Sequence, residues 1–232
     1  LHLLPMLLLL LRDETSDVRL SVISNLGAIN DVIGVELLSQ SLLPAIVDLS
    51  EDPKWRVRLA IIEHIPMLAE QLGIDFFTDK LSNLCMVWLG DDIYTVRRAA
   101  SENLKKLVNL FGGNWSIDTM MPRIDRLHVH TNYLHRMTSL YVIQALIKVL
   151  NNEQQETYLL PTVNTLCTDH VPNVRFTAAK TLGMIHNSLN NSNSKKGQHA
   201  KACESIYTLL MKMTTDTDRD VRYFSRKALE EI

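Results

Sequence analysis

Apolar residues recur along most of the chain with the three- and four-residue spacing of an amphipathic helix. In residues 42–49 the apolar positions are Leu42, Leu43, Ile46, Val47 and Leu49, and in residues 57–72 they are Val57, Ile61, Ile62, Ile65, Leu68 and Leu72. A short polar turn, residues 51–55, separates these two segments. Few segments alternate with the two-residue period of a half-buried strand. The pattern therefore predicts an all-α chain of twelve helices arranged in six pairs.

The helix pairs follow a fixed interval in the sequence. The arginines that mark the second helix are 39 residues apart, except the last, which follows after 47: Arg19, Arg58, Arg97, Arg136, Arg175 and Arg222. Valine precedes five of these arginines, and His135 precedes the fourth. An aspartate lies six residues before five of them (Asp13, Asp52, Asp91, Asp169, Asp216), and His130 takes its place in the fourth repeat. Apolar residues lie seven residues after every arginine, and prolines lie fourteen before four of them (Pro5, Pro44, Pro122, Pro161).

A repeat of this length, with proline in the first helix, aspartate at its end and Val-Arg in the second, resembles the HEAT repeat. We predict an α-α superhelix, a solenoid in one array with repeats at residues 1–34, 35–73, 74–112, 113–151, 152–190 and 199–232. The eight additional residues fall in the polar, turn-rich stretch 187–198, which we predict to be a loop insertion. Stacked pairs bury their apolar faces against their neighbours.

The aspartate and arginine columns predict a polar ladder near the turn inside each pair. An aspartate can cap free backbone amides there, and the forked guanidinium of arginine can bridge carboxylates of adjacent repeats. We assign this structural role, rather than phosphate binding, to Arg19, Arg58, Arg97, Arg136 and Arg175.

The same turns carry aromatic residues where turn tips are usually polar. Three residues before the arginine, repeats two to five have Trp55, Tyr94, Tyr133 and Pro172. At a repeat spacing of about 10 Å these residues would form a row about 30 Å long, with the composition of a protein-binding hot spot. The alternative is that each aromatic ring folds back over its own helix pair. The predicted partner-binding residues are Lys54, Trp55, Arg56, Ile93, Tyr94, Tyr133, Leu134, Val171, Pro172 and Asn173.

Composition and motifs argue against an enzyme, a cofactor and a metal. A formal net charge of −2 gives no general attraction to nucleic acid or to an anionic membrane, and no uninterrupted apolar run is long enough to span a bilayer. The three cysteines, Cys85, Cys167 and Cys203, are far apart in apolar helical patterns and are expected to be reduced. Three nearby histidines, His128, His130 and His135, have no further ligands to complete a zinc site. The sequence contains no phosphate-binding glycine loop, nucleophile elbow or metalloprotease motif.

Several longer runs are similar to the C-terminal repeats of the scaffolding A subunits of type 2A protein phosphatases. They are residues 54–63 (KWRVRLAIIE), 81–88 (LSNLCMVW), 132–138 (NYLHRMT), 173–176 (NVRF) and 220–224 (DVRYF). The resemblance implies a family horseshoe of fifteen repeats, of which this chain would hold the last six. It implies that the intra-repeat turns bind the phosphatase catalytic subunit, with the turn of Lys54, Trp55 and Arg56 as a major anchor. A regulatory B-type subunit would bind mainly through repeats absent from this chain.

Other interpretations compete with the resemblance. Another HEAT- or armadillo-type adaptor, such as a nuclear-transport receptor, would bind a different protein partner. A nucleic-acid-binding repeat protein would need a strongly basic ridge. The chain opens at Leu1 rather than methionine, and we expect it to be a fragment. We expect a cytoplasmic location, with the nucleus as an additional one.

Overall fold

The structure is a computed structural model that describes residues 3–29, 38–191 and 199–232. The described residues form helices and the turns between them, with no strand among them. The chain divides into two compact units, residues 1–111 and 112–232. The division falls within one residue of the predicted boundary between the third and fourth repeats. That all six repeats form one continuous array stays a prediction.

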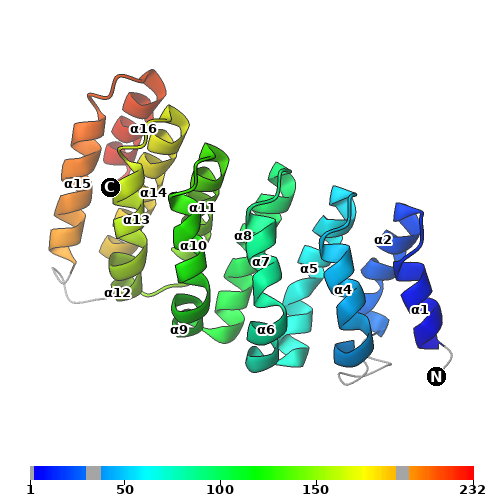
Figure 1. Cartoon of the computed structure of the whole chain (residues 1–232). Helices are drawn as coiled ribbons and strands as arrows, with labels where there is room; N and C mark the ends of the chain where they lie inside the picture. Colours follow the sequence, from blue (N-terminus) through cyan, green and yellow to red (C-terminus); the bar gives the residue numbers. More distant parts are fainter. Residues whose placement is uncertain (1–2, 30–37, 192–198) are drawn as a thin grey trace. The chain divides into compact units, whose positions relative to one another are not determined.

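Unit 1 contains the first three helix pairs (Figure 1). The first pair is α1 (Leu3–Leu11) and α2 (Ser16–Ser24). The second consists of η1 (Leu38–Leu42) and α4 (Leu43–Ser50), followed by α5 (Trp55–Leu72). The third consists of α6 (Ile74–Lys80) and α7 (Ser82–Leu89), followed by α8 (Tyr94–Phe111).

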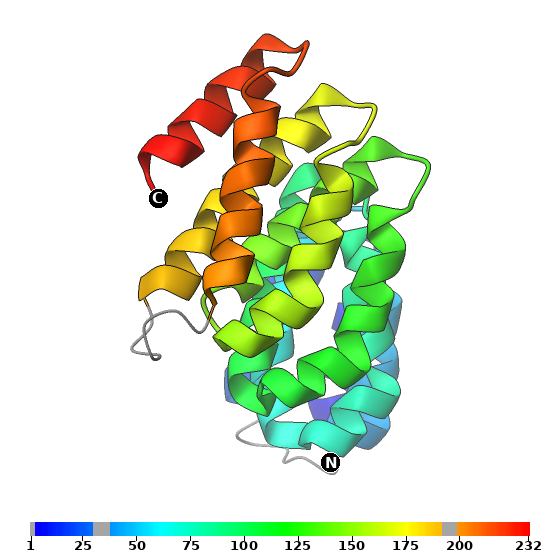
Figure 2. The same cartoon turned by 90° about the vertical axis from the view of Figure 1, so that its left-hand side faces the viewer.

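Unit 2 contains the other three pairs, which Figure 2 shows from the side. The fourth pair is α9 (Gly113–Trp115), η2 (Ser116–Met120) and α10 (Met121–His128) against α11 (Tyr133–Leu146). The fifth is α12 (Asn152–Gln154), η3 (Gln155–Leu159) and α13 (Leu160–Leu166) against α14 (Pro172–Asn191). The sixth is α15 (Ala200–Met213) against α16 (Arg219–Glu230).

Proline explains why several first helices are segmented rather than continuous. A wide π turn ends two residues before Pro44, Pro122 and Pro161. Proline has no N–H to donate and its ring clashes with the carbonyl four residues earlier, so the preceding turn widens. The sixth repeat has Thr208 at this position, and α15 runs without interruption. The predicted helix pairs are therefore present, but three first helices change from π-helical to α-helical geometry just before the proline.

The apolar columns form the core of each unit. The residues seven positions after the arginine are at most 1% exposed in the first five repeats: Leu26, Ile65, Leu104, Ile143 and Leu182. Trp88 is fully buried, and its indole N–H donates to the Ser50 carbonyl of the preceding repeat at 3.0 Å. Repeats within a unit thus share both an apolar interior and polar contacts. The prediction of an all-α fold built from helix pairs is confirmed for the described residues.

The predicted loop insertion begins later than we expected. Residues 187–191 continue helix α14, because Leu189 extends the apolar face of Leu182 and Ile185 and is itself buried. Residues 192–198, the remainder of the insertion, lie outside the described residues. Immediately after them, the His199 Nδ1 atom lies 2.8 Å from the Glu156 Oε2 atom, which joins the start of α15 to the preceding repeat. The sequence pattern did not predict this contact.

Helices α14 and α16 approach each other closely at Gly183. A Cβ atom added at this position would lie 3.1 Å from the Ala228 Cβ atom. We expect Gly183→Leu to lower the free energy of unfolding of the chain by about 1–3 kcal/mol, because the larger side chain forces the two helices apart. Urea denaturation followed by circular dichroism measures this loss. Combining Gly183→Leu with Ala228→Gly should recover part of the stability, and no recovery would contradict the close approach.

Candidate functional site

The turn between paired helices has the same hydrogen bonds in the five repeats that have an aspartate at this position. The aspartate side chain accepts the backbone N–H two residues later, as in Asp52 to Lys54 at 2.8 Å and Asp169 to Val171 at 2.8 Å. The arginine six residues after the aspartate donates back to the carbonyl of that aspartate, as Arg58 does at 2.6 Å. The turn is therefore held from both sides by side chains that the repeat supplies.

Arginine also connects each turn to the next one within a unit. In unit 1, Arg58 donates through Nε and Nη2 to both carboxylate oxygens of Asp91, at 2.7 and 3.0 Å. The Nε and Nη2 atoms of Arg19 likewise lie 2.9 and 3.1 Å from the carboxylate oxygens of Asp52. In unit 2 the equivalent bidentate pairs are Arg136–Asp169 and Arg175–Asp216, at 2.6–2.9 Å. The predicted ladder is confirmed at these four rungs, which we call the Arg–Asp ladder.

Arg97 performs the part of its predicted structural role that lies within its own turn, and a rung to the next repeat, which belongs to the other unit, stays a prediction. Its Nη1 atom donates to the carbonyls of Asp91 and Asp92 in its own turn, at 2.6 and 2.9 Å. In the next repeat the aspartate position holds His130, which offers no carboxylate for a rung. His130 does perform the local task of an aspartate, because its Nδ1 atom accepts the Asn132 N–H at 3.0 Å.

The turns of unit 1 display most of their predicted binding residues to solvent. Lys54, Arg56 and Ile93 are exposed, and the Tyr94 side chain is 54% exposed. Trp55 is half-buried, with the Arg56 guanidinium 4.5 Å from its ring centre. This stacking favours a preformed contact residue, because both side chains lose little freedom on binding.

A pocket of about 470 Å³ lies beside this tryptophan. Its lining joins the first two turns of unit 1 and consists of Ser16, Asp17, Leu20, Pro53, Lys54, Trp55 and Arg56. Apolar and charged side chains contribute to this lining in similar measure, and the charges are of both signs, which suits a protruding side chain of a protein partner.

The turns of unit 2 display the remaining predicted residues. Tyr133 is 38% exposed and Asn173 is exposed, whereas Leu134, Val171 and Pro172 are half-buried. The Asn132 side chain caps α11 by accepting the Leu134 N–H at 3.0 Å, which fixes the turn that carries Tyr133. Each unit thus brings its own turn residues together. The continuous row from Trp55 to Pro172 crosses the two units and stays a prediction, as does binding by these residues.

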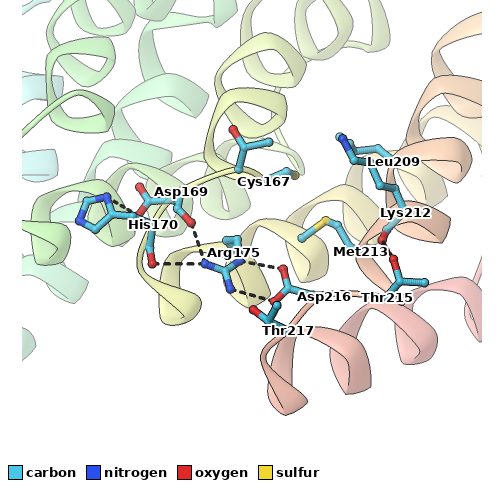
Figure 3. A pocket seen from close by; sticks show the side chains of 11 residues that line it. Cys167, Asp169, His170, Arg175, Leu209, Lys212, Met213, Thr215, Asp216 and Thr217 are labelled. Carbon is cyan, nitrogen blue, oxygen red and sulfur yellow. Dashed lines mark hydrogen bonds and ion pairs between the residues drawn. The ribbon is translucent and has the colours of Figure 1, made fainter.

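A second pocket, of about 490 Å³, lies between the ends of α13 and α15 (Figure 3). The close-up shows Arg175 directed toward the Asp216 carboxylate and the Asp169 backbone, so the charged groups at its centre belong to the Arg–Asp ladder. Burial raises the pKa of the Cys167 thiol to about 12, which keeps it protonated and a poor nucleophile. This thiol is therefore not an activated nucleophile.

Possible metal ligands are not clustered in the part of the chain that the structure describes. No cluster of three or more His, Cys, Asp or Glu side chains suited to a metal occurs among the described residues. His130 and His135 lie with ring centres 4.1 Å apart, and this contact is a packing contact within one turn. Within residues 3–29, 38–191 and 199–232, no helix combines the length and apolar character needed to cross a bilayer.

Comparison with known proteins gives the same repeat class and a specific set of relatives. The HEAT repeat family model matches residues 3–33, 42–72 and 159–189, which correspond to the predicted first, second and fifth repeats. The regulatory A subunit of protein phosphatase PP2A from Saccharomyces cerevisiae is 44% identical over 129 residues, 55% of this chain. The protein of the same name from Schizosaccharomyces pombe is 47% identical over 68 residues, 29% of this chain. This chain contains HEAT repeats and is similar, over part of its length, to the PP2A regulatory A subunits.

The match covers a small part of each relative. The aligned region spans 20% of the length of the Saccharomyces cerevisiae protein and 12% of the length of the Schizosaccharomyces pombe protein.

Solved structures support the all-α repeat fold of this chain. One match is to a structure of Kap95p with RanGDP, with a TM-score of 0.72 and 15% sequence identity. The match covers 99% of this chain and 30% of the chain in that structure. Another match is to the TOG3 structure of Drosophila melanogaster Mini spindles, with a TM-score of 0.65 and 15% sequence identity. It covers 97% of this chain and 92% of the chain in that structure. At this level of identity the likeness concerns the fold alone.

The buried rung Arg136–Asp169 should matter far more to stability than an exposed ion pair. Its two side chains are 7% and 6% exposed, whereas those of Arg12 and Asp48 are both 61% exposed. We expect Arg136→Met to lower the free energy of unfolding by about 3 kcal/mol, because Asp169 is left buried without its partner. The matched change Arg12→Met should cost less than about 1 kcal/mol. Equal losses in urea denaturation would contradict the ladder as a structural constraint.

The ladder also predicts how stability responds to acid. The hydrogen bonds from Arg175 hold the pKa of Asp216 below its ordinary value, although burial opposes them. A lowered pKa in the folded state stabilises the chain above the unfolded pKa of about 3.9 and loses this effect as pH falls through the folded pKa. Between about pH 5 and pH 2, the urea midpoint of the parent should therefore fall more steeply than that of Asp216→Asn. Parallel curves for the two proteins would contradict this assignment.

Proposed function

We propose that this chain is a non-catalytic scaffold that binds the catalytic subunit of a type 2A serine/threonine protein phosphatase through its intra-repeat turns. Its relation to the PP2A regulatory A subunits carries the proposal. The name of these relatives refers to a phosphatase complex, and the turns offer exposed aromatic and basic residues of the kind that form protein-binding hot spots. Assembly with a regulatory B-type subunit would depend mainly on repeats other than these six.

The proposed mechanism needs no chemistry from the chain itself. Each turn is fixed by its own aspartate and arginine, so the contact residues are presented with little loss of conformational freedom on binding. A scaffold that holds an enzyme and its specificity subunit together raises their effective concentration. Its repeats contact only their neighbours, so small adjustments spread along a unit.

A different HEAT-type adaptor role, such as nuclear transport, has less support. The structural likeness to Kap95p comes with 15% sequence identity, whereas the likeness to the Saccharomyces cerevisiae phosphatase protein comes with 44%. The favoured partner is therefore the phosphatase catalytic subunit, and the expected location is the cytoplasm together with the nucleus.

Substitution of the turn aromatics tests the proposal. In a binding titration against a type 2A catalytic subunit, Trp55→Ala should weaken binding at least tenfold, or about 1.4 kcal/mol. Tyr133→Ala should also weaken it, through loss of an exposed contact on the fourth turn. Tyr158→Ala is a matched control, because this side chain is 40% exposed but lies on η3, away from the turns.

Two outcomes would count against the proposed function. A well-folded parent that does not bind the catalytic subunit would remove this partner. Equal loss of affinity in Tyr158→Ala and Tyr133→Ala would remove the turns as the binding surface. A phosphatase assay on the chain alone should show no activity.

A further inference from the structure

A cluster of aromatic rings and lysines lies on the second helices of the last two repeats. The Lys180 Nζ atom lies 3.6 Å from the centre of the Phe224 ring and 4.9 Å from that of Phe176. The two phenylalanine rings are 5.2 Å apart, and Tyr223 meets Phe224 edge-on at 5.1 Å. We call these four residues, together with Lys227, the aromatic–lysine cluster.

The packing of α14 against α16 creates the cluster. The two helices lie side by side, as Figures 1 and 2 show, and the small residues Gly183 and Ala228 allow their close approach. One to two turns nearer the helix starts, the same approach brings Phe176 and Lys180 of α14 against Phe224 of α16. The cluster is therefore set by the helix packing rather than by a loop.

Much of the cluster is available to a partner. The Tyr223 side chain is 58% exposed, Lys180 and Lys227 are exposed, and Phe176 and Phe224 are half-buried. Aromatic faces beneath a cation form a platform on which an apolar side chain and an anion can bind next to each other.

The positive charge of the cluster is only partly compensated. Burial lowers the pKa of Lys180, the nearby charge of Lys227 lowers it further, and Asp220 raises it. Lys227 lies 3.8 Å from Glu231 in an exposed pair, and among the described residues no carboxylate forms an ion pair with Lys180. An anion placed between the two ammonium groups would relieve their repulsion.

The earlier repeats differ at the same positions. Five residues after the arginine, unit 1 has the exposed acids Glu63 and Glu102 in its second and third repeats, where the last two repeats have Lys180 and Lys227. One residue after the arginine, Leu59 and Arg98 stand in place of Phe176 and Tyr223. The cluster is thus not a feature of the repeat itself, and the stacking of repeats does not require it.

We infer that the aromatic–lysine cluster is a docking site for an acidic segment of a protein partner. A carboxylate of the segment would lie between Lys180 and Lys227, and a neighbouring apolar side chain would pack on Tyr223 and Phe224. Charge complementarity with two lysines selects the acidic residue, and the exposed rings select the apolar one. The site does not depend on the identity of the partner that binds the turns.

Binding of a defined acidic peptide tests this inference. The probe is a fluorescently labelled dodecapeptide of four Glu-Asp-Leu units, and its neutral counterpart has four Gln-Asn-Leu units. Fluorescence anisotropy with the full chain should show binding of the acidic peptide that weakens as salt is added, because the contact is electrostatic. Lys227→Met should reduce the affinity about threefold to fivefold, as expected for one exposed charge pair.

Controls separate binding from folding. Lys180→Met should weaken binding at least as much as Lys227→Met, and an unchanged melting temperature of Lys227→Met excludes a folding defect. Lys201→Met removes an exposed lysine from α15 and should bind like the parent.

Three results would each overturn the inference: parent-like binding by Lys227→Met, equal binding of the neutral peptide, or no binding by the parent. Tighter binding of single-stranded DNA that is lost in the same variants would overturn the assignment to a protein partner.

Discussion

One arginine in each repeat holds a turn together, and within each unit two of these arginines tie their turn to the next. Its Nη1 group donates to carbonyls in its own turn, and its Nε and Nη2 groups bind the aspartate of the following repeat. The planar guanidinium can serve both turns at once because its donors form a rigid fork, which lysine does not have. The spacing of the turns within each unit, and hence the placement of any contact residue on them, depends on this interaction.

The ladder explains why the turns can be aromatic without losing their shape. In an ordinary turn, polar residues at the tip satisfy the backbone. Here the aspartate and the arginine perform that task from the flanks, as in Asp91 accepting the Ile93 N–H at 2.8 Å. The side chains of Trp55 and Tyr94 are therefore not needed to satisfy the backbone of their turns, and in the fourth turn His130 and Asn132 perform the task beside Tyr133. Structure and proposed binding therefore use separate residues of the same short segment.

Sequence alone predicted the features that repeat and missed those that occur once. The arginine, aspartate and apolar columns predicted the helix pairs and four ladder rungs, because each column reports the same contact several times. The extension of α14 through Leu189 and the contact of His199 with Glu156 depend on a single insertion, and no other repeat reports on them. The π turns before proline could have been predicted from Pro44, Pro122 and Pro161.

The turn site was predicted only in part, because some of its features also depend on contacts that do not repeat. Exposure of Tyr94 and Tyr133 follows from the turn position, whereas the stacking of Arg56 on Trp55 depends on side-chain rotamers that a pattern does not contain. The aromatic–lysine cluster needed the packing of α14 on α16, although its signal was present in the sequence as lysine and aromatic residues at matching positions of the last two repeats.

The turns, and not the outer faces of the first helices, are the surface that we propose for the phosphatase catalytic subunit. Hydrogen–deuterium exchange of the chain with and without a type 2A catalytic subunit tests this central claim most directly. We expect slower exchange on binding in the turn segments 51–57, 90–96, 130–136 and 168–174, with little change along the outer face of α7 around Val87, which is exposed. Protection on α7 with unchanged exchange in the turns would contradict the claim.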